Sequence, residues 1–157
     1  MKNKNNEFEI DLYSLRLHPA DYKDFEIDSL FSEKISNQVI ELDSQTPVKI
    51  NLRASNVKSG FYLKGEIEYK LKGVCSKCLE DIEKGEIAKF ESFFIEDKTD
   101  DDQNFVYELS GTHANLVPLI IDTIGENLEY QPLCRAECKG LCGFCGENLN
   151  LLENHTC

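Results

Sequence analysis

The chain has 157 residues, of which 41% are hydrophobic and 29% are charged, and its net charge is −12 at pH 7. These values are typical of a globular protein with one main domain, and they exclude a disordered chain. The acidic balance argues against a protein that binds nucleic acid over its whole surface. Because the sequence has neither a signal peptide nor an apolar run long enough to span a membrane, we expect a cytoplasmic protein with reduced thiols.

Several segments alternate apolar and polar residues, as half-buried strands do. We expect strands over residues 8–15, 47–57, 61–73, 82–96 and 105–109. The apolar spacing within residues 24–35 predicts a short helix instead. Residues 96–104 are acidic and nearly free of apolar side chains, which predicts a solvated loop.

The cleanest pair of strands, 61–73 and 82–96, flanks a tight turn that carries Cys75 and Cys78. This arrangement predicts an antiparallel hairpin with both cysteines at its tip. The alternation of the second strand slips between Ile87 and Phe90, which indicates a β-bulge.

A late helix is expected over residues 115–130, with Asn115 as its N-cap and Pro118 in its first turn. Its predicted buried stripe consists of Leu116, Leu119, Ile120, Ile124 and Leu128. No internal repeat or low-complexity tract is found.

Cysteines dominate the last part of the sequence and supply the clearest chemical signal. Zinc is held by four Cys or His ligands, and a two-residue gap lets both sulfurs of a Cys pair reach one ion from one turn. Two such pairs occur, Cys75/Cys78 and Cys142/Cys145. The eight candidate ligands, enough for two structural zinc ions, are Cys75, Cys78, Cys134, Cys138, Cys142, Cys145, His155 and Cys157.

Two pairings are compatible with the spacing. In the first, residues 142–157 form a local C-x2-C-x9-H-x-C site, while Cys134 and Cys138 join the distant hairpin pair and tie the tail to it. In the second, the four cysteines of residues 134–145 hold one ion and leave the hairpin pair free. An iron–sulfur cluster is the chemical rival of zinc, although His155 favours zinc.

The predicted fold class is therefore α+β: a mostly antiparallel β-sheet, one late helix and a small C-terminal zinc-stabilised module. We expect residues 1–133 to form the mixed domain that carries the hairpin. Residues 134–157, the tail, are expected to bind zinc and to pack back on the hairpin.

Eight protein ligands for two ions leave no position open for water or substrate, so the predicted sites are structural and we expect no enzyme. The sequence also lacks an H-E-x-x-H motif and a glycine-rich phosphate loop. The enzymatic alternative is thiol redox chemistry at Cys75/Cys78, but such a pair usually begins a helix rather than a hairpin turn.

The segment "CSKCLE" resembles the C-x-R-C-L-E segment of the large ribosomal RNA subunit accumulation protein family (YceD), with Lys77 where arginine is usual. The tail "QPLCRAECKGLCGFCGENLN" resembles the version of that family with a cysteine-rich end, with Gly143 in place of proline. Glu126 and the helix before the tail fit as well. The family tail ends C-x-C, whereas this chain has His155 and Cys157, a substitution that zinc tolerates.

The resemblance, which covers most of the chain from about Val48, implies a cytoplasmic factor needed for large-subunit ribosomal RNA synthesis, processing or stability. Its partner would be ribosomal RNA or a ribosome-assembly or RNA-processing protein; no membrane and no small-molecule substrate is expected. Residues 53–77 carry six basic and two acidic side chains. Candidate RNA or partner contacts are Lys64, Lys70, Lys72, Lys77, Arg135 and Lys139. The alternative is an acidic adaptor for a basic protein, which the net charge favours.

Overall fold

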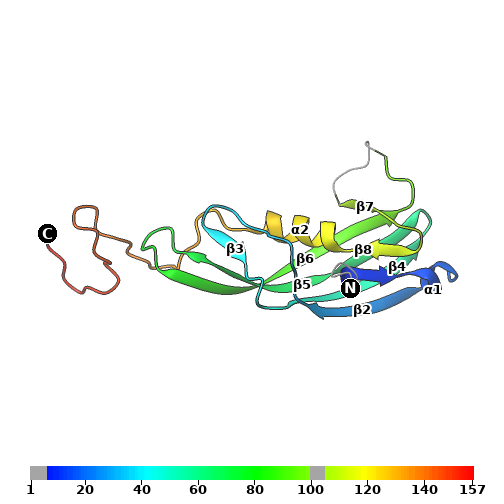
Figure 1. The fold of residues 1–157 in the computed structure, drawn as a ribbon, viewed down its shortest axis with the longest axis horizontal. Coiled ribbons are helices and arrows are strands. Elements are labelled where there is room, and N and C mark those ends of the chain that lie inside the picture. The colour runs from blue at the N-terminus through cyan, green and yellow to red at the C-terminus, as the bar shows by residue number, and fades with distance from the viewer. Residues whose placement is uncertain (1–6, 100–104) are drawn as a thin grey trace.

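The computed structural model describes residues 7–99 and 105–157, and its main feature is a long, twisted β-sheet (Figure 1). The strands are β1 (Glu9–Asp11), β2 (Tyr22–Ser29), β3 (Ile40–Leu42), β4 (Val48–Val57), β5 (Gly60–Val74), β6 (Asp81–Ile95), β7 (Val106–Glu108) and β8 (His113–Asn115). The helices are α1 (Tyr13–Arg16) and α2 (Val117–Glu126).

The sheet has the strand order β2-β4-β5-β6-β7, and β3 pairs with β5 beyond the end of β4. All pairs are antiparallel except β6–β7, which is parallel. The two short strands β1 and β8 form a separate antiparallel pair. Figure 1 shows the β5–β6 turn at one end of the long axis, with the C-terminal residues extending beyond it.

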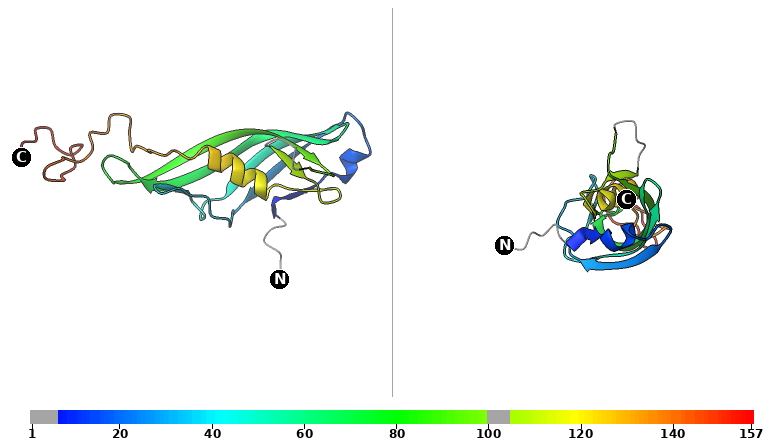
Figure 2. Two further views of the ribbon diagram at one scale, coloured as in Figure 1. Left: turned by 90° about the horizontal axis from the view of Figure 1, so that it is seen from above. Right: turned by 90° about the vertical axis from the view of Figure 1, so that its right-hand side faces the viewer.

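One face of the sheet is buried because its strands alternate strictly. In β5 the side chains of Leu63, Ile67, Tyr69 and Leu71 are all 2% exposed or less. The β1–β8 pair and α2 lie over this face (Figure 2), and α2 contacts β6. The helix contributes four buried side chains, which are Leu119, Ile120, Thr123 and Ile124. The opposite face is open and carries the polar residues of each strand.

Local hydrogen bonds set the limits of α2. The Val117 N–H donates to Asn115 Oδ1 at 3.0 Å just before the helix, and the Asn127 side-chain amide donates to the Thr123 carbonyl at 2.7 Å at its end. The helix is therefore shorter than the predicted 115–130. Within residues 7–99 and 105–157, no helix combines the length and apolarity that a membrane crossing requires.

The α+β fold class and the cysteine-bearing hairpin are confirmed, but three further local predictions are wrong. Residues 24–35 form no helix, because β2 pairs with β4 along its whole length from Tyr22 to Ser29. The expected strand over 8–15 is only β1, followed by the single turn of α1. The β5–β6 register is one-to-one from Phe61↔Phe94 to Val74↔Asp81, so β6 has no bulge.

The apparent slip in β6 has a simple cause. Ile87 belongs to the open face and is 61% exposed, so an apolar residue occupies a polar position without shifting the register. Of the loop predicted over 96–104, residues 100–104 lie outside the described part of the chain.

Candidate metal centres

The hairpin turn holds its two cysteines in a compact knuckle, residues 75–80, which we call the first knuckle. The Cys75 N–H donates to the Glu80 carbonyl at 2.8 Å, and the Leu79 N–H donates to the Cys75 carbonyl at 3.0 Å. Leu79 adopts a left-handed backbone with φ 60°. This turn directs both sulfurs inward, and the side chains of Cys75 and Cys78 are 0% and 4% exposed.

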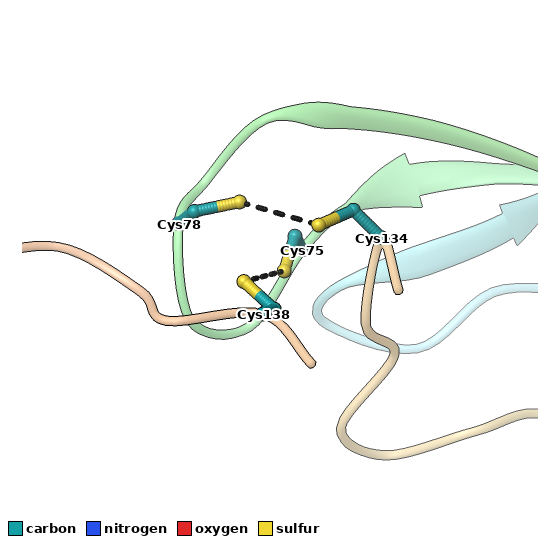
Figure 3. Close-up of side chains that lie close together, drawn as sticks. All are labelled: Cys75, Cys78, Cys134 and Cys138. Atoms are coloured by element: carbon teal, nitrogen blue, oxygen red, sulfur yellow. Dashed lines mark hydrogen bonds between the residues drawn. The ribbon is translucent and has the colours of Figure 1, made fainter. Parts of the chain in front are cut away.

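The chain after α2 returns to this knuckle and brings two more thiols (Figure 3). The Ser76 N–H donates to the Pro132 carbonyl at 2.8 Å. Cys138 Sγ lies 3.7 Å from Cys75 Sγ, and Cys134 Sγ lies 3.6 Å from Cys78 Sγ. These four sulfurs, all within 4.8 Å of one another, form the inner cluster.

The inner cluster has the dimensions of a tetrahedral thiolate site. A Zn–S bond of about 2.3 Å implies a sulfur–sulfur separation of about 3.8 Å along each tetrahedral edge. The observed 3.6 and 3.7 Å agree with that value, whereas a disulfide would need about 2.0 Å. All seven cysteines are free thiols. The donor set therefore fits a thiophilic, tetrahedral cation such as zinc.

The electrostatics of the inner cluster lower the pKa values of Cys75 and Cys138 and raise those of Cys78 and Cys134. Burial disfavours the Cys75 thiolate, yet the backbone N–H groups of Cys78, Cys134 and Lys77 donate to its sulfur and lower its pKa to about 6. The Glu80 N–H favours ionisation of Cys78, but burial and the neighbouring thiols outweigh it and raise the Cys78 pKa to about 12. Full ionisation of the four thiols therefore needs a bound cation.

Residues 142–147 repeat the first knuckle and form the second knuckle. The Cys142 N–H donates to the Glu147 carbonyl at 2.8 Å, the Gly146 N–H donates to the Cys142 carbonyl at 2.9 Å, and Gly146 has φ 75°. These are the same bonds and the same left-handed position as in the first knuckle. The expectation of no internal repeat was wrong at this scale, and the pattern shared by "CSKCLE" and "CGFCGE" was the signal.

His155 and Cys157 close the outer cluster, which also contains Cys142 and Cys145. Cys157 Sγ lies 3.2 Å from Cys142 Sγ and 3.5 Å from Cys145 Sγ. The His155 Nε2 atom lies 3.3 Å from Cys145 Sγ and 3.1 Å from Cys157 Sγ. These edges are somewhat shorter than the roughly 3.6–3.8 Å of an ideal zinc site. Unlike the buried inner cluster, this one exposes two of its thiols.

The outer cluster likewise contains one thiol with a lowered pKa and one with a raised pKa. Backbone N–H groups of Cys145 and Phe144 lower the pKa of Cys142 to about 6, while the adjacent thiol of Cys142 is the main group that raises the pKa of Cys157 to about 12. The His155 Nδ1 atom, on the side away from the sulfurs, lies 3.8 Å from Glu147 Oε2. A carboxylate behind a ligating histidine is a common arrangement at zinc sites.

Two asparagines that follow the second knuckle connect it to the inner cluster. The Asn150 side-chain amide donates to Cys138 Sγ at 3.4 Å, and its oxygen accepts the Lys139 N–H at 2.9 Å. Asn148 donates to the Glu80 carboxylate at 2.8 Å. The sequence predicts these asparagines only as part of the local site over residues 142–157, and their contact with the inner cluster is not evident from the spacing.

The candidate basic contacts do not form one patch. Lys64 pairs with Glu91 at 3.0 Å, and Lys72 lies 3.8 Å from Glu41. Because a strand rises roughly 3.3 Å per residue, Lys64 lies about 30 Å or more from the hairpin tip. The other four are exposed: Lys70 on the open face of β5, and Lys77, Arg135 and Lys139 beside the inner-cluster cysteines.

The fold and the two clusters together define a class: a small β-rich protein with two four-ligand thiol sites at one end of its sheet. The family model described as large ribosomal RNA subunit accumulation protein YceD matches residues 63–156. This match covers more than half of the chain, so the protein belongs to that family.

Curated relatives occur in mycobacteria. Uncharacterized proteins of Mycobacterium bovis and Mycobacterium tuberculosis are each 28% identical to this chain over 126 residues, which is 78% of this chain and 61% of theirs. An uncharacterized protein of Mycobacterium leprae is 23% identical over 126 residues, covering 78% of this chain and 58% of its own length. The chain thus spans about three fifths of the length of these relatives. No solved structure matches.

Proposed function

We propose that this protein is a non-catalytic zinc-binding factor that supports large-subunit ribosomal RNA synthesis, processing or stability. The observation that carries the proposal is the inner cluster. Its two halves come from the family's hairpin pair and from the cysteine-rich tail, and its four sulfurs fit one zinc ion.

A structural rather than catalytic role agrees with the ligand count. Each cluster supplies four ligand atoms, so a tetrahedral ion bound there would have no position left for water or substrate. In the inner cluster, Cys75, Cys78 and Cys138 are also buried. Both clusters would therefore stabilise structure, with metal ligation contributing folding free energy.

The tail would be a separate module that zinc holds against the sheet. We propose residues 1–133 as the α+β domain and residues 134–157 as this module. Its contacts with the sheet domain include the inner cluster, the Leu141 N–H bond to the Lys77 carbonyl at 3.1 Å, and the Asn148–Glu80 bond. The Leu141 side chain is only partly buried against the core, so the docking would depend largely on metal.

A protein adaptor is the second candidate, and the charges on the open sheet face favour it. Arg53 forms two hydrogen bonds to Asp24, and Lys64 is paired with Glu91. These cations are partly neutralised before any phosphate approaches, and the whole chain carries −12. A basic ribosomal or RNA-processing protein would therefore be a better partner than bare RNA.

We propose that the protein acts in the cytoplasm, where large-subunit ribosomal RNA would be made and processed. Seven free thiols support a reducing compartment, since an oxidising one would convert adjacent cysteines to disulfides.

The test combines a metal count with a measurement of ribosomal RNA. In cells that lack the endogenous gene, the parent chain should restore the ratio of large-subunit to small-subunit RNA, and Cys75→Ser should not. Native mass spectrometry should find two zinc ions on the parent and one on Cys75→Ser. The matched control is Ser76→Ala, an exposed neighbour in the same turn.

Two results would contradict the proposal. One is a normal RNA ratio with Cys75→Ser, at a cellular abundance equal to that of the parent. The other is a parent chain, purified without chelator, that carries no metal; a reversible Cys75–Cys78 disulfide would then favour the redox interpretation.

A further inference from the structure

The most exposed large apolar side chains lie toward the C-terminal end. Among the described residues, Phe144 is 95% exposed, Tyr130 is 86% exposed and Leu151 is 75% exposed. Single exposed apolar residues are common on protein surfaces, so exposure alone does not mark an interaction site. Phe144 is the most informative of the three because it occupies the tip of the second knuckle.

The repeat of the two knuckles indicates what this tip can bind. Phe144 occupies the position that Lys77 has in the first knuckle. There, the Lys77 carbonyl accepts the Leu141 N–H at 3.1 Å, and the adjacent Gly140 lies so close that a Cβ would be 3.2 Å from the same oxygen. The first knuckle is thus covered by residues 140–141 of the tail.

The second knuckle has the same shape without such a cover. In residues 7–99 and 105–157, no backbone N–H donates to the Phe144 carbonyl, and the Phe144 ring is almost wholly exposed. A second segment of polypeptide could therefore donate a backbone N–H to this carbonyl and pack beside the ring, as residues 140–141 do on the first knuckle.

The charge around the second knuckle indicates which kind of polypeptide segment would bind there. Residues 140–157 contain Glu147 and Glu153 and no lysine or arginine. Zinc-bound clusters of four thiolates, or of three thiolates and a neutral histidine, carry formal charges of roughly −2 and −1. An RNA backbone would be repelled by residues 140–157, whereas a lysine- or arginine-rich polypeptide would be attracted to them.

We propose that the second knuckle is a docking surface for a basic segment of a partner protein. The segment donates a backbone N–H to the Phe144 carbonyl, packs an apolar side chain on the Phe144 ring and directs its cations toward Glu147 and Glu153. This proposal rests on the proposed function, because it names the partner class of the same zinc-stabilised tail.

Photo-crosslinking in cells that produce the full chain tests the surface. The photoreactive amino acid p-benzoylphenylalanine replaces Phe144, or in the control replaces Tyr13, which is 57% exposed on α1 at the other end of the sheet. The expected product at position 144 is destroyed by protease, resists ribonuclease and contains a lysine- or arginine-rich segment. A ribonuclease-sensitive product, a crosslink to a second copy of this chain, or no more product than at position 13 would overturn the proposal.

Binding of the crosslinked segment, made as a synthetic peptide, tests the contact itself. Phe144→Ala should weaken peptide binding at least tenfold while native mass spectrometry still finds two zinc ions, because the substitution keeps the backbone N–H that Phe144 donates to Cys142. Tyr13→Ala should bind like the parent. Unchanged affinity of Phe144→Ala would overturn the proposal.

The two proposals can fail separately. If Cys75→Ser loses large-subunit RNA while position 144 crosslinks no basic segment, the docking proposal is wrong and the proposed function stands. If Cys75→Ser leaves the RNA ratio unchanged, the proposed function itself is wrong, whatever position 144 crosslinks.

Discussion

Replacing Asn150 by alanine removes a hydrogen bond to a sulfur of the inner cluster. The Asn150 amide donates to Cys138 Sγ at 3.4 Å, and this is the first cause of the lowered pKa of Cys138. Since the amide stabilises the thiolate form that binds metal, Asn150→Ala should weaken zinc at the inner cluster and leave the outer cluster loaded.

The size of the expected loss in zinc affinity depends on whether water can replace the lost hydrogen-bond donor. Cys138 is 5% exposed, so water does not replace the lost donor, and a hydrogen bond to a charged group contributes about 1.5–3 kcal/mol. The Lys139 N–H, which also loses its acceptor, belongs to an exposed residue and can turn to water. The expected loss of zinc affinity is therefore roughly 10- to 100-fold, the range typical of groups that support metal ligands.

Native mass spectrometry during titration with a chelator of known affinity measures this loss. Asn150→Ala should release its first ion at roughly 10- to 100-fold lower chelator activity than the parent does. Asn51→Ala, an exposed asparagine of β4, is the matched control and should release zinc like the parent. Release from Asn150→Ala at the parent's chelator activity would refute the role assigned to this hydrogen bond.

Three further predictions concern the sheet and its dependence on metal. Chelation should abolish hydrogen-exchange protection in both knuckles. Strands β4, β5 and β6 should stay protected, because the buried face of the sheet contains none of the candidate ligands. Loss of protection in these strands as well would contradict the prediction. Gly65→Ala should destabilise the protein by about 3 kcal/mol in denaturant unfolding, because its Cβ would lie 2.2 Å from the Asn51 carbonyl oxygen. The control is Gly85→Ala, whose Cβ would have no atom within 4 Å and which should have little effect. Tyr107→Phe should lower the free energy of unfolding by about 1 kcal/mol, because the Tyr107 O–H donates to Asp122 at 2.7 Å. Equal unfolding midpoints of the parent and the variant would argue against that bond. Burial and then Asp122 raise the pKa of Tyr107, so folding favours its protonated form, and the parent should lose more stability above pH 10.0 than Tyr107→Phe does.

The strands that the sequence predicts well are those with one fully buried face. In β5, Leu63, Ile67 and Leu71 alternate with charged residues, and the hairpin follows from that pattern alone. β2 was mistaken for a helix because it lies at the sheet edge, where Phe25 and Ile27 are only half-buried and their alternation is weak. Pairing with β4 determines its conformation, and no local pattern reports that pairing.

For the candidate site, too, local features could be predicted from the sequence and long-range ones could not. The candidate ligands could be identified from the cysteine spacing, since a two-residue gap is a local property of a turn. The pairing of the clusters could not, because it depends on where the chain goes after α2. Asn148 and Asn150 were missed for the same reason, since their partners Glu80 and Cys138 lie on other segments.

The separation of the two halves of the inner cluster has a consequence during translation. Cys138 follows Cys75 by 63 residues, which is about 3 to 13 s of synthesis at 5–20 residues per second. The outer cluster needs only the 15 residues between Cys142 and Cys157, or about 1 to 3 s. On the nascent chain, the hairpin pair thus waits as an unprotected dithiol through much of elongation. Its survival until Cys138 emerges depends on the reducing power of the surrounding compartment.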